Sequence, residues 1–262
     1  MCEFDELSVD NEFNQILKAT SMLLIRHGSV SGSHRAALKR AMLFFADVTD
    51  IEPGATRWSA LRFTRNTRSY QVLLSVCQLV IEGLLMTTQS GDHKLRSFVD
   101  DQAMSRLYEK FVLEYFVKHW PELRPRASRI AWDLGAGETT MLPLMQSDIM
   151  LSKDHNVLII DAKYYSRNTQ ERFDVHTVHS ANLYQIFAYV TNKKAEEPAK
   201  SVAGMLLYAK TDQAIQPDAH WLIGGNEFKA QTLDLGLDFK EIAQQLDDIA
   251  LRHFGVASSQ EV

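Results

Sequence analysis

The chain has little of what marks several large classes of protein. Its 262 residues include 2 cysteines, Cys2 and Cys77, which are too few for a disulfide framework and favour a reducing, cytoplasmic location. No positively charged start followed by an apolar stretch marks a signal peptide. The most apolar run, Val72–Met86, contains Gln78 and Glu82 and is shorter than a membrane span. We therefore expect a buried helix there and no membrane association.

A phosphate-binding loop and a broadly basic charge are also missing. No Gly-x-x-x-x-Gly-Lys-(Ser/Thr) pattern occurs, so the chain is not expected to hydrolyse nucleotides. The formal net charge of −5 argues against a broadly basic nucleic-acid binder. Between Lys18 and Arg68, however, nine basic residues stand against three acidic ones, an excess of six positive charges. This segment fits either contact with a phosphate backbone or a solvated face of a helical bundle.

What is present indicates two parts of different architecture. Hydrophobic residues make up 45% of the chain and charged residues 23%, as in ordinary globular proteins. Apolar residues at helical spacing predict a helical region over residues 1–94, ending in a linker at Thr87–Lys94. Residues 95–262 mix both periodicities and predict an α/β (α+β mixed) domain, a mixed sheet flanked by helices.

The predicted helices are Glu12–Arg26, Ser33–Ala46, Tyr70–Met86, Gln102–His119, Ala181–Val190 and Phe239–His253. The predicted strands are Arg129–Leu134, Met145–Leu151, Val157–Ala162, Ser201–Ala209, Trp221–Ile223 and Gln231–Leu233.

The most informative stretch is the hairpin of Met145–Leu151 and Val157–Ala162, because it can place Asp148 and Asp161 at neighbouring strand ends. Two carboxylates held close together suit a hard divalent cation, normally Mg²⁺. Lys163 lies two residues beyond Asp161, so on a strand it projects to the same face, where an ammonium can neutralise charge developing on a phosphate. The alternative is that Asp161 and Lys163 form a surface ion pair, which would stabilise the fold by about 0–1 kcal/mol. The position of Asp161 argues against this alternative, because Asp161 interrupts an apolar run that should be buried.

Residues on both sides of the hairpin extend this candidate site. Glu109 lies next to the apolar face of the preceding helix, although a solvated glutamate would look the same. Gln185 and Tyr189 stand at i and i+4 on one face of the following helix, where they are either site residues or a surface amide and a core aromatic. The polar loop of residues 164–178 lies between the hairpin and this following helix and begins directly after Lys163. It either closes over substrate or only connects the two elements.

This pattern resembles the PD-(D/E)xK nucleases, whose metal site is an Asp followed by an (Asp/Glu)-x-Lys on the next strand. Ser147 stands here where that family name has proline. The resemblance implies a nuclease fold, an acidic metal contact from the preceding helix at Glu109, and a Gln-x-x-x-Tyr element at Gln185 and Tyr189 as in RecB-type nucleases and McrC.

Further segments, in the same order along nearly the whole chain, narrow the resemblance to McrC, the nuclease subunit of a modification-dependent (5-methylcytosine) restriction system. They are Phe4–Asn11, Asn14–Ala19, Arg65–Tyr70, Leu107–Val112, Asp161–Tyr165 and Leu183–Gln185. McrC relatives have a further amino-terminal region before the Phe-Asp-Glu-Leu element. This chain starts almost on that element, so the part that engages the motor partner in relatives is expected to be missing.

The resemblance implies a Mg²⁺-dependent DNA endonuclease, with Mn²⁺ as a possible substitute, whose separate McrB-like GTPase partner recognises methylated DNA. Asp148, Asp161 and the Ala162 carbonyl would hold the metal, Lys163 would assist the attacking water, and Glu109 and Gln185 would support them. Two other interpretations stay open. One is a stand-alone RecB-like repair nuclease acting on DNA ends, and the other is a non-catalytic assembly or regulatory module derived from a truncated McrC.

Overall fold

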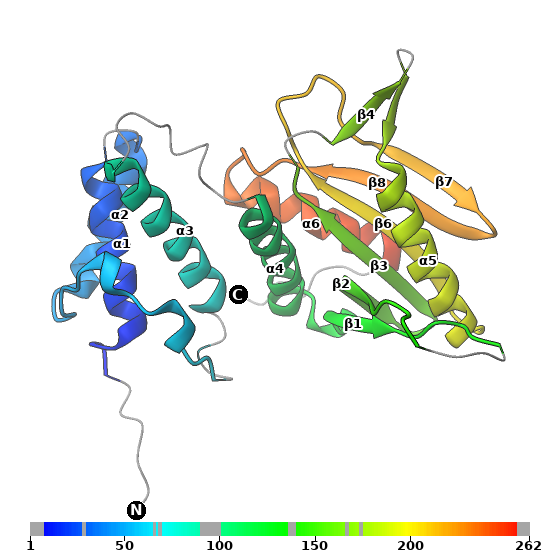
Figure 1. Cartoon of the computed structure of the whole chain (residues 1–262), viewed down its shortest axis with the longest axis horizontal. Coiled ribbons are helices and arrows are strands. Elements are labelled where there is room, and N and C mark those ends of the chain that lie inside the picture. The colour runs from blue at the N-terminus through cyan, green and yellow to red at the C-terminus, as the bar shows by residue number, and fades with distance from the viewer. Residues whose placement is uncertain are drawn as a thin grey trace, which may run out of the picture. The chain divides into compact units, whose positions relative to one another are not determined.

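In the computed structural model the chain divides into two compact units, residues 1–103 and 104–262 (Figure 1). The structure describes residues 8–27, 30–64, 67, 70–89, 101–135, 140–165, 168–172 and 175–255. The first unit is helical, as predicted, and the second contains the expected mixed sheet. The predicted boundary at residues 94 and 95 falls outside the described residues. No helix in the described part of the chain is long and apolar enough to span a lipid bilayer.

The first unit contains helices α1 (Glu12–Arg26), α2 (Gly32–Met42) and α3 (Tyr70–Gln89), and residues of α1 and α3 form most of its small apolar core. Helix α1 begins where the Asn11 side chain accepts a hydrogen bond from the Asn14 N–H. Three 3₁₀ turns join α2 to α3, at Leu43–Phe45, Pro53–Ala55 and Trp58–Ala60. The buried core residues are Ile16, Leu61, Leu74, Cys77 and Ile81.

The basic segment of this unit is partly used to hold the fold. Lys18 pairs with Asp50 at 3.0 Å and donates to the Val48 carbonyl at 2.6 Å, while Arg35 donates to two backbone carbonyls. Contact of the other cations with a phosphate backbone stays a prediction. Of these, Arg65 and Arg68 lie outside the described residues, and Arg26, Lys39, Arg40, Arg57 and Arg62 are exposed.

The second unit is built on a six-stranded mixed sheet of order β1-β2-β3-β6-β8-β7. Neighbours β3/β6 and β6/β8 run parallel, and the other pairs run antiparallel. The strands are β1 (Arg126–Ile130), β2 (Met145–Lys153), β3 (Asn156–Lys163), β6 (Ser201–Ala209), β7 (Ala219–Ile223) and β8 (Asn226–Leu233).

Helices cover both faces of this sheet (Figure 1). The apolar side chains of α4 (Asp101–His119) and α6 (Phe239–Phe254) pack with Ile149, Ile160 and Leu207 on one face. Helix α5 (Ser180–Glu196), which precedes β6 along the chain, packs on the other face with Ile159 and Leu206. Because successive strand residues point to opposite faces, an unbroken apolar run such as Val157–Ile160 serves both cores at once.

Several predicted elements differ from the structure. Helix α3 continues to Gln89, into the predicted linker, α5 continues to Glu196 rather than ending at Val190, and β8 begins at Asn226 rather than at Gln231. Strand β1 ends at Ile130 rather than at Leu134, because Ile130 pairs with Met145, where β2 begins, so no partner strand extends the ladder. The predicted helix Ser33–Ala46 ends at Met42 and continues as a 3₁₀ turn. The expected loop at residues 164–178 contains a second, two-stranded sheet of β4 (Thr169–Arg172) and β5 (Val175–Val178).

Candidate active site

Strand β2 carries a bulge at Asp148. Arg126 pairs with Met150 and Ser128 with Ser147, so Asp148 and Ile149 together lie opposite the single residue Ala127. The hydroxyl of Ser147 bridges this irregularity: it accepts a hydrogen bond from the Ser128 N–H and donates to the Ser128 carbonyl, both at 3.3 Å. Serine in place of the motif's proline therefore has a structural use here, since proline has no hydroxyl to bridge with.

Asp148 reaches the next strand through this distortion. The paired residues of β2 and β3 end at Ile149 and Ile160, so the two strands part just where both carboxylates stand. The Ala162 N–H donates a 2.8 Å hydrogen bond to Asp148 Oδ2. Asp148 is thus fixed beside Asp161, as the hairpin predicts. The contact of Ala162 is made by its N–H, and metal binding by its carbonyl stays a prediction.

Asp161 and Lys163 form a buried pair, which rules out the surface pair considered from sequence. The Lys163 ammonium lies 2.8 Å from Asp161 Oδ2, and the two side chains are 14% and 1% exposed. Apart from its contacts with Lys163 and Asp148, the Asp161 carboxylate has no hydrogen-bond donor beside it among the described residues. A buried carboxylate with so few partners is costly, so this group calls for a stronger cationic partner.

The acidic groups of the site hold protons more tightly than usual. Burial raises the pKa of Asp161 to about 7; Lys163 opposes this rise and the Asp148 charge adds to it. Burial also raises the pKa of Asp148 and, with the Asp148 charge, brings the pKa of Glu109 on α4 to about 7. Burial alone would lower the pKa of Lys163, but the charges of Asp161 and Asp148 raise it. Three carboxyl groups and one lysine therefore interact electrostatically.

These donors fit Mg²⁺ bound through few protein oxygens. Among the described residues no three His, Cys, Asp or Glu side chains come close enough to form a complete metal cage. Mg²⁺ keeps several waters and binds through one or two carboxylates plus substrate phosphate, which matches the Asp148 and Asp161 pair. The buried carboxylate of Asp161, for which Lys163 is the one cationic partner among the described residues, supports this fit.

Helix α5 orients the lysine from the other side. Lys163 Nζ donates a 3.1 Å hydrogen bond to Gln185 Oε1, and Gln185 Nε2 donates at 2.9 Å to the Tyr189 hydroxyl. Gln185 therefore contacts the site directly, and Tyr189 holds the Gln185 amide while its ring is buried in the core. The i, i+4 spacing on one helix face produces this arrangement.

A second series of hydrogen-bonded side chains lies near Lys163 and was not predicted from the sequence. The Tyr165 hydroxyl donates to Asn182 Oδ1 at 3.2 Å, and Asn182 Nδ2 donates to the Tyr208 hydroxyl at 3.1 Å. Burial raises the pKa of Tyr208 to about 12, so this phenol stays protonated at neutral pH. Spacing offers the only signal in the sequence, because Tyr165 follows Lys163 by two residues and Asn182 precedes Gln185 by three.

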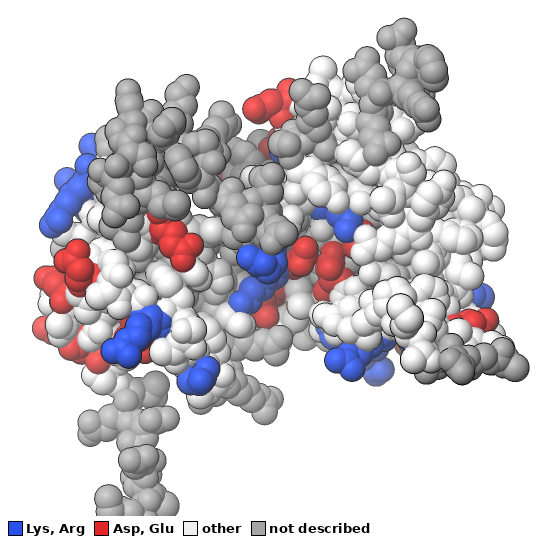
Figure 2. Space-filling view, viewed as in Figure 1, with Lys and Arg blue, Asp and Glu red and all other residues white. Residues whose placement is uncertain are grey.

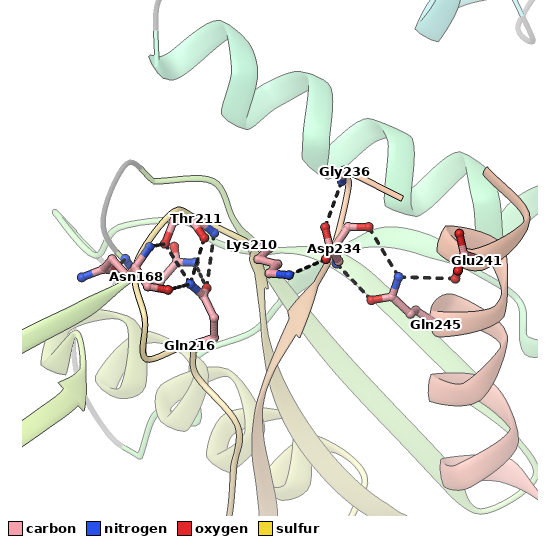
Figure 3. A network of polar contacts seen from close by, with 9 residues as sticks. Asn168, Lys210, Thr211, Gln216, Asp234, Gly236, Glu241 and Gln245 are labelled. Atoms are coloured by element: carbon pink, nitrogen blue, oxygen red, sulfur yellow. Dashed lines mark hydrogen bonds and ion pairs between the residues drawn. The ribbon is translucent and has the colours of Figure 1, made fainter. Parts of the chain in front are cut away.

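A buried polar network anchors the chain that leaves Lys163 (Figure 3). Asn168 is fully buried just before β4, and its N–H donates to Gln213 Oε1 at 2.7 Å. Its side-chain amide donates to the Ala209 carbonyl at the end of β6. Gln216 closes the same network by donating to the Thr211 carbonyl at 3.0 Å. The hairpin β4–β5 is therefore tied to the loop that follows β6, the strand that pairs with the Asp161 strand β3.

A six-stranded mixed sheet with helices on both faces makes this a mixed α/β protein, and two carboxylates and a lysine come together on its strands β2 and β3. A sequence model of the family described as "McrBC 5-methylcytosine restriction system component" matches residues 1–209, and the chain belongs to this family. It is 28% identical over 250 residues to the "Type IV methyl-directed restriction enzyme EcoKMcrBC" of Escherichia coli (strain K12), covering 94% of this chain and 71% of that protein.

Among solved structures, the chain is similar to one from the complex of Thermococcus gammatolerans McrB AAA+ hexamers with bound McrC. The identity is 21% and the TM-score 0.42, with 94% of this chain and 54% of that chain covered. This chain thus spans about half the length of that solved chain. Of the segments that carry the sequence resemblance, Phe4–Leu7 and most of Arg65–Tyr70 lie outside the described residues, whereas Leu107–Val112, Asp161–Tyr165 and Leu183–Gln185 line or adjoin the site.

Proposed function

We propose that the chain is the DNA-cleaving subunit of a 5-methylcytosine-dependent restriction system and hydrolyses phosphodiester bonds with Mg²⁺ or Mn²⁺. Membership of the McrBC family supports the assignment to a 5-methylcytosine restriction system. The observation that carries the chemistry is the buried carboxylate of Asp161, which lies beside Asp148 and keeps a raised pKa although the Lys163 ammonium is 2.8 Å away. A buried charge that one ammonium compensates only in part is stabilised by a further cation.

In this proposal Asp148 and Asp161 hold the metal, with the Ala162 carbonyl as a further oxygen. The bound ion supplies a polarised phosphate and a more acidic water. Lys163 stands where its charge can balance negative charge developing on the phosphate, and Gln185 keeps its ammonium in place. Glu109, with a pKa of about 7, can take up a proton near neutral pH.

A separate subunit supplies recognition and motor activity. The sequence contains no phosphate-binding loop and carries a net charge of −5, and the family description names one component of a larger system. We therefore propose a McrB-like GTPase as the partner and methylated DNA as the substrate of the assembled complex.

Substitution of the carboxylates tests this function. Asp148→Asn and Asp161→Asn should abolish Mg²⁺-dependent DNA cleavage by the assembled complex, because each removes a charged ligand while keeping the side-chain shape. Asp154→Asn is the matched control: Asp154 is exposed in the β2–β3 turn with φ 50°, a conformation that asparagine also tolerates. Cleavage should be followed on methylated duplex DNA, and metal binding by calorimetric titration with Mn²⁺.

The possible results separate the three interpretations. Normal cleavage by either site variant would rule out the assigned ligands. Cutting of DNA ends that requires neither methylation nor nucleotide would favour the repair nuclease. If the wild-type chain binds no metal and cuts nothing with its partner present, it is a non-catalytic module.

A further inference from the structure

A cleft of about 320 Å³ opens directly beside the catalytic carboxylates. One wall is helix α4, which contributes Arg106, Glu109 and Lys110. The other wall is the β1–β2 edge of the sheet with its bulge, and Asp148 lines the cleft there. The cleft is thus a continuation of the proposed metal site toward the edge strand, and its basic residues Arg106 and Lys110 have no role in the chemistry proposed so far.

The helix presents its polar stripe to this cleft because of its spacing. Arg106, Glu109 and Lys110 stand at i, i+3 and i+4, and therefore share one face. The opposite face carries the buried Tyr108, Val112, Tyr115 and Phe116 that fix the helix on the sheet. Packing of the apolar face thus decides that the charged residues point into the cleft.

The cleft carries side chains of both charges. Glu109 and Asp148 are acidic, whereas Arg106 and Lys110 are basic, and Arg106 is close enough to Glu109 to oppose the rise in the pKa of Glu109. Arg106 is exposed and makes no hydrogen bond or ion pair with any residue that the structure describes. Figure 2 shows basic and acidic side chains next to each other over the region of α4.

We propose that this cleft is a subsite for one nucleotide of the strand being cut, adjoining the scissile phosphate. The inference rests on the proposed nuclease function. Arg106 binds the phosphate through its fork of N–H donors and Lys110 adds a second positive charge. Leu113 and Ala127 form an apolar wall for the sugar. The volume lies at the lower end of small-ligand sites, so one nucleotide fits and a duplex does not. Recognition through phosphate and sugar carries no sequence information, as suits a subunit that cuts where its partner directs.

Salt dependence of DNA binding provides the test. The full chain is titrated with a short duplex in EDTA, where no cleavage occurs, over a series of salt concentrations. Each lost phosphate contact should make the plot of log K against log [salt] shallower by about 0.9, or about eightfold in affinity at 0.1 M salt. We expect this loss for Arg106→Gln and for Lys110→Gln, and retention of the wild-type slope for Arg106→Lys. The control is Lys118→Gln, an exposed residue of the same helix outside the cleft.

Occupancy is measured independently by alkylation. In an Arg106→Cys variant, saturating DNA should slow modification of that cysteine, followed by peptide-resolved mass spectrometry, while a Lys118→Cys variant should react at an unchanged rate. Wild-type slopes in both glutamine variants, or no protection at position 106, would overturn the subsite and leave the nuclease proposal standing. Reduced slopes and protection in a chain that never cleaves DNA would keep the subsite and reject the nuclease.

Discussion

The folded chain buries the Asp161 carboxylate at a cost in desolvation free energy. Asp161 interrupts the apolar run of β3 and is 1% exposed, where leucine would fill the same place without a desolvation penalty. Lys163 compensates only in part, since the pKa of Asp161 is still raised to about 7. A residue that conflicts with its local environment in this way marks a site where function has overridden stability.

The metal-free chain should therefore become less stable as the pH rises. The pKa of Asp161 in the folded chain is above its ordinary value, so the unfolded chain gives up this proton first. The stability contribution is complete below about pH 4 and is lost as the pH rises through about 7. Asp161→Asn should remove this dependence and raise the melting temperature at pH 8 in EDTA. A variant that melts below the wild type there would contradict the assignment.

Lys163 should matter for turnover more than for affinity. Lys163→Ala should lower kcat of the assembled complex by about 10²-fold or more with a much smaller change in KM, because its charge is needed in the transition state. Lys163→Arg keeps the charge but places a larger planar group between Asp161 and Gln185, so it should not restore the full rate. Steady-state kinetics on methylated DNA decides between these outcomes, and equal rates for the wild type and Lys163→Ala would exclude a catalytic role.

At the scale of elements, two contacts place the site. The bulge of β2 turns Asp148 toward the Ala162 N–H, and helix α5 brings Gln185 to Lys163. The second contact needs α5 to lie close to β6, which Gly204 allows. A Cβ at this position would stand 2.8 Å from Ile186 Cγ1 and 2.8 Å from Val190 Cγ2, closer than any real contact.

Gly204→Ala should consequently destabilise the second unit. Overpacking of this kind costs about 1–3 kcal/mol, to be measured by urea unfolding. Gly32→Ala is the control, since a Cβ there meets nothing within 4 Å at the start of α2, and alanine favours helix. If α5 moves to relieve the clash, the Gln185 contact with Lys163 weakens and kcat falls as well. A Gly204→Ala chain of unchanged stability would show that the helix does not pack as closely as described.

At the scale of the whole molecule, the chain combines a helical unit with a sheet unit that carries the complete candidate site. The net charge is −5, and basic side chains such as Lys18 and Arg35 are partly engaged in backbone contacts of the first unit. Long-range attraction of DNA by the chain as a whole is therefore weak.

The isolated chain should accordingly bind DNA feebly at physiological salt and cleave little with Mg²⁺ alone. Addition of the proposed GTPase partner and GTP should bring out cleavage that depends on methylation, because this proposal assigns recognition and delivery to the partner. Filter binding and gel assays with and without the partner measure both effects. Tight binding and nucleotide-independent cutting by the chain alone would contradict this division of labour.

The sequence by itself determined the features that depend on local periodicity. Helix α1 and strand β6 have the predicted limits, and α4 and α6 differ from prediction by a single residue at one end. The side-chain period of two in a strand also sufficed to put Asp161 and Lys163 on one face. These patterns reflect which face of an element is buried, because apolar residues recur at the positions of that face.

Only the tertiary structure decided what depends on partners distant in sequence. The end of β1 follows from where β2 begins, and the hairpin β4–β5 is anchored through Asn168 by residues more than 40 positions away. The pKa values of Glu109 and Asp161 arise from burial by several elements at once. The cleft at Arg106 exists because α4 lies beside the β1–β2 edge of the sheet, where β2 is bulged. Desolvation and cleft shape are set by packing between elements, and no local pattern records them.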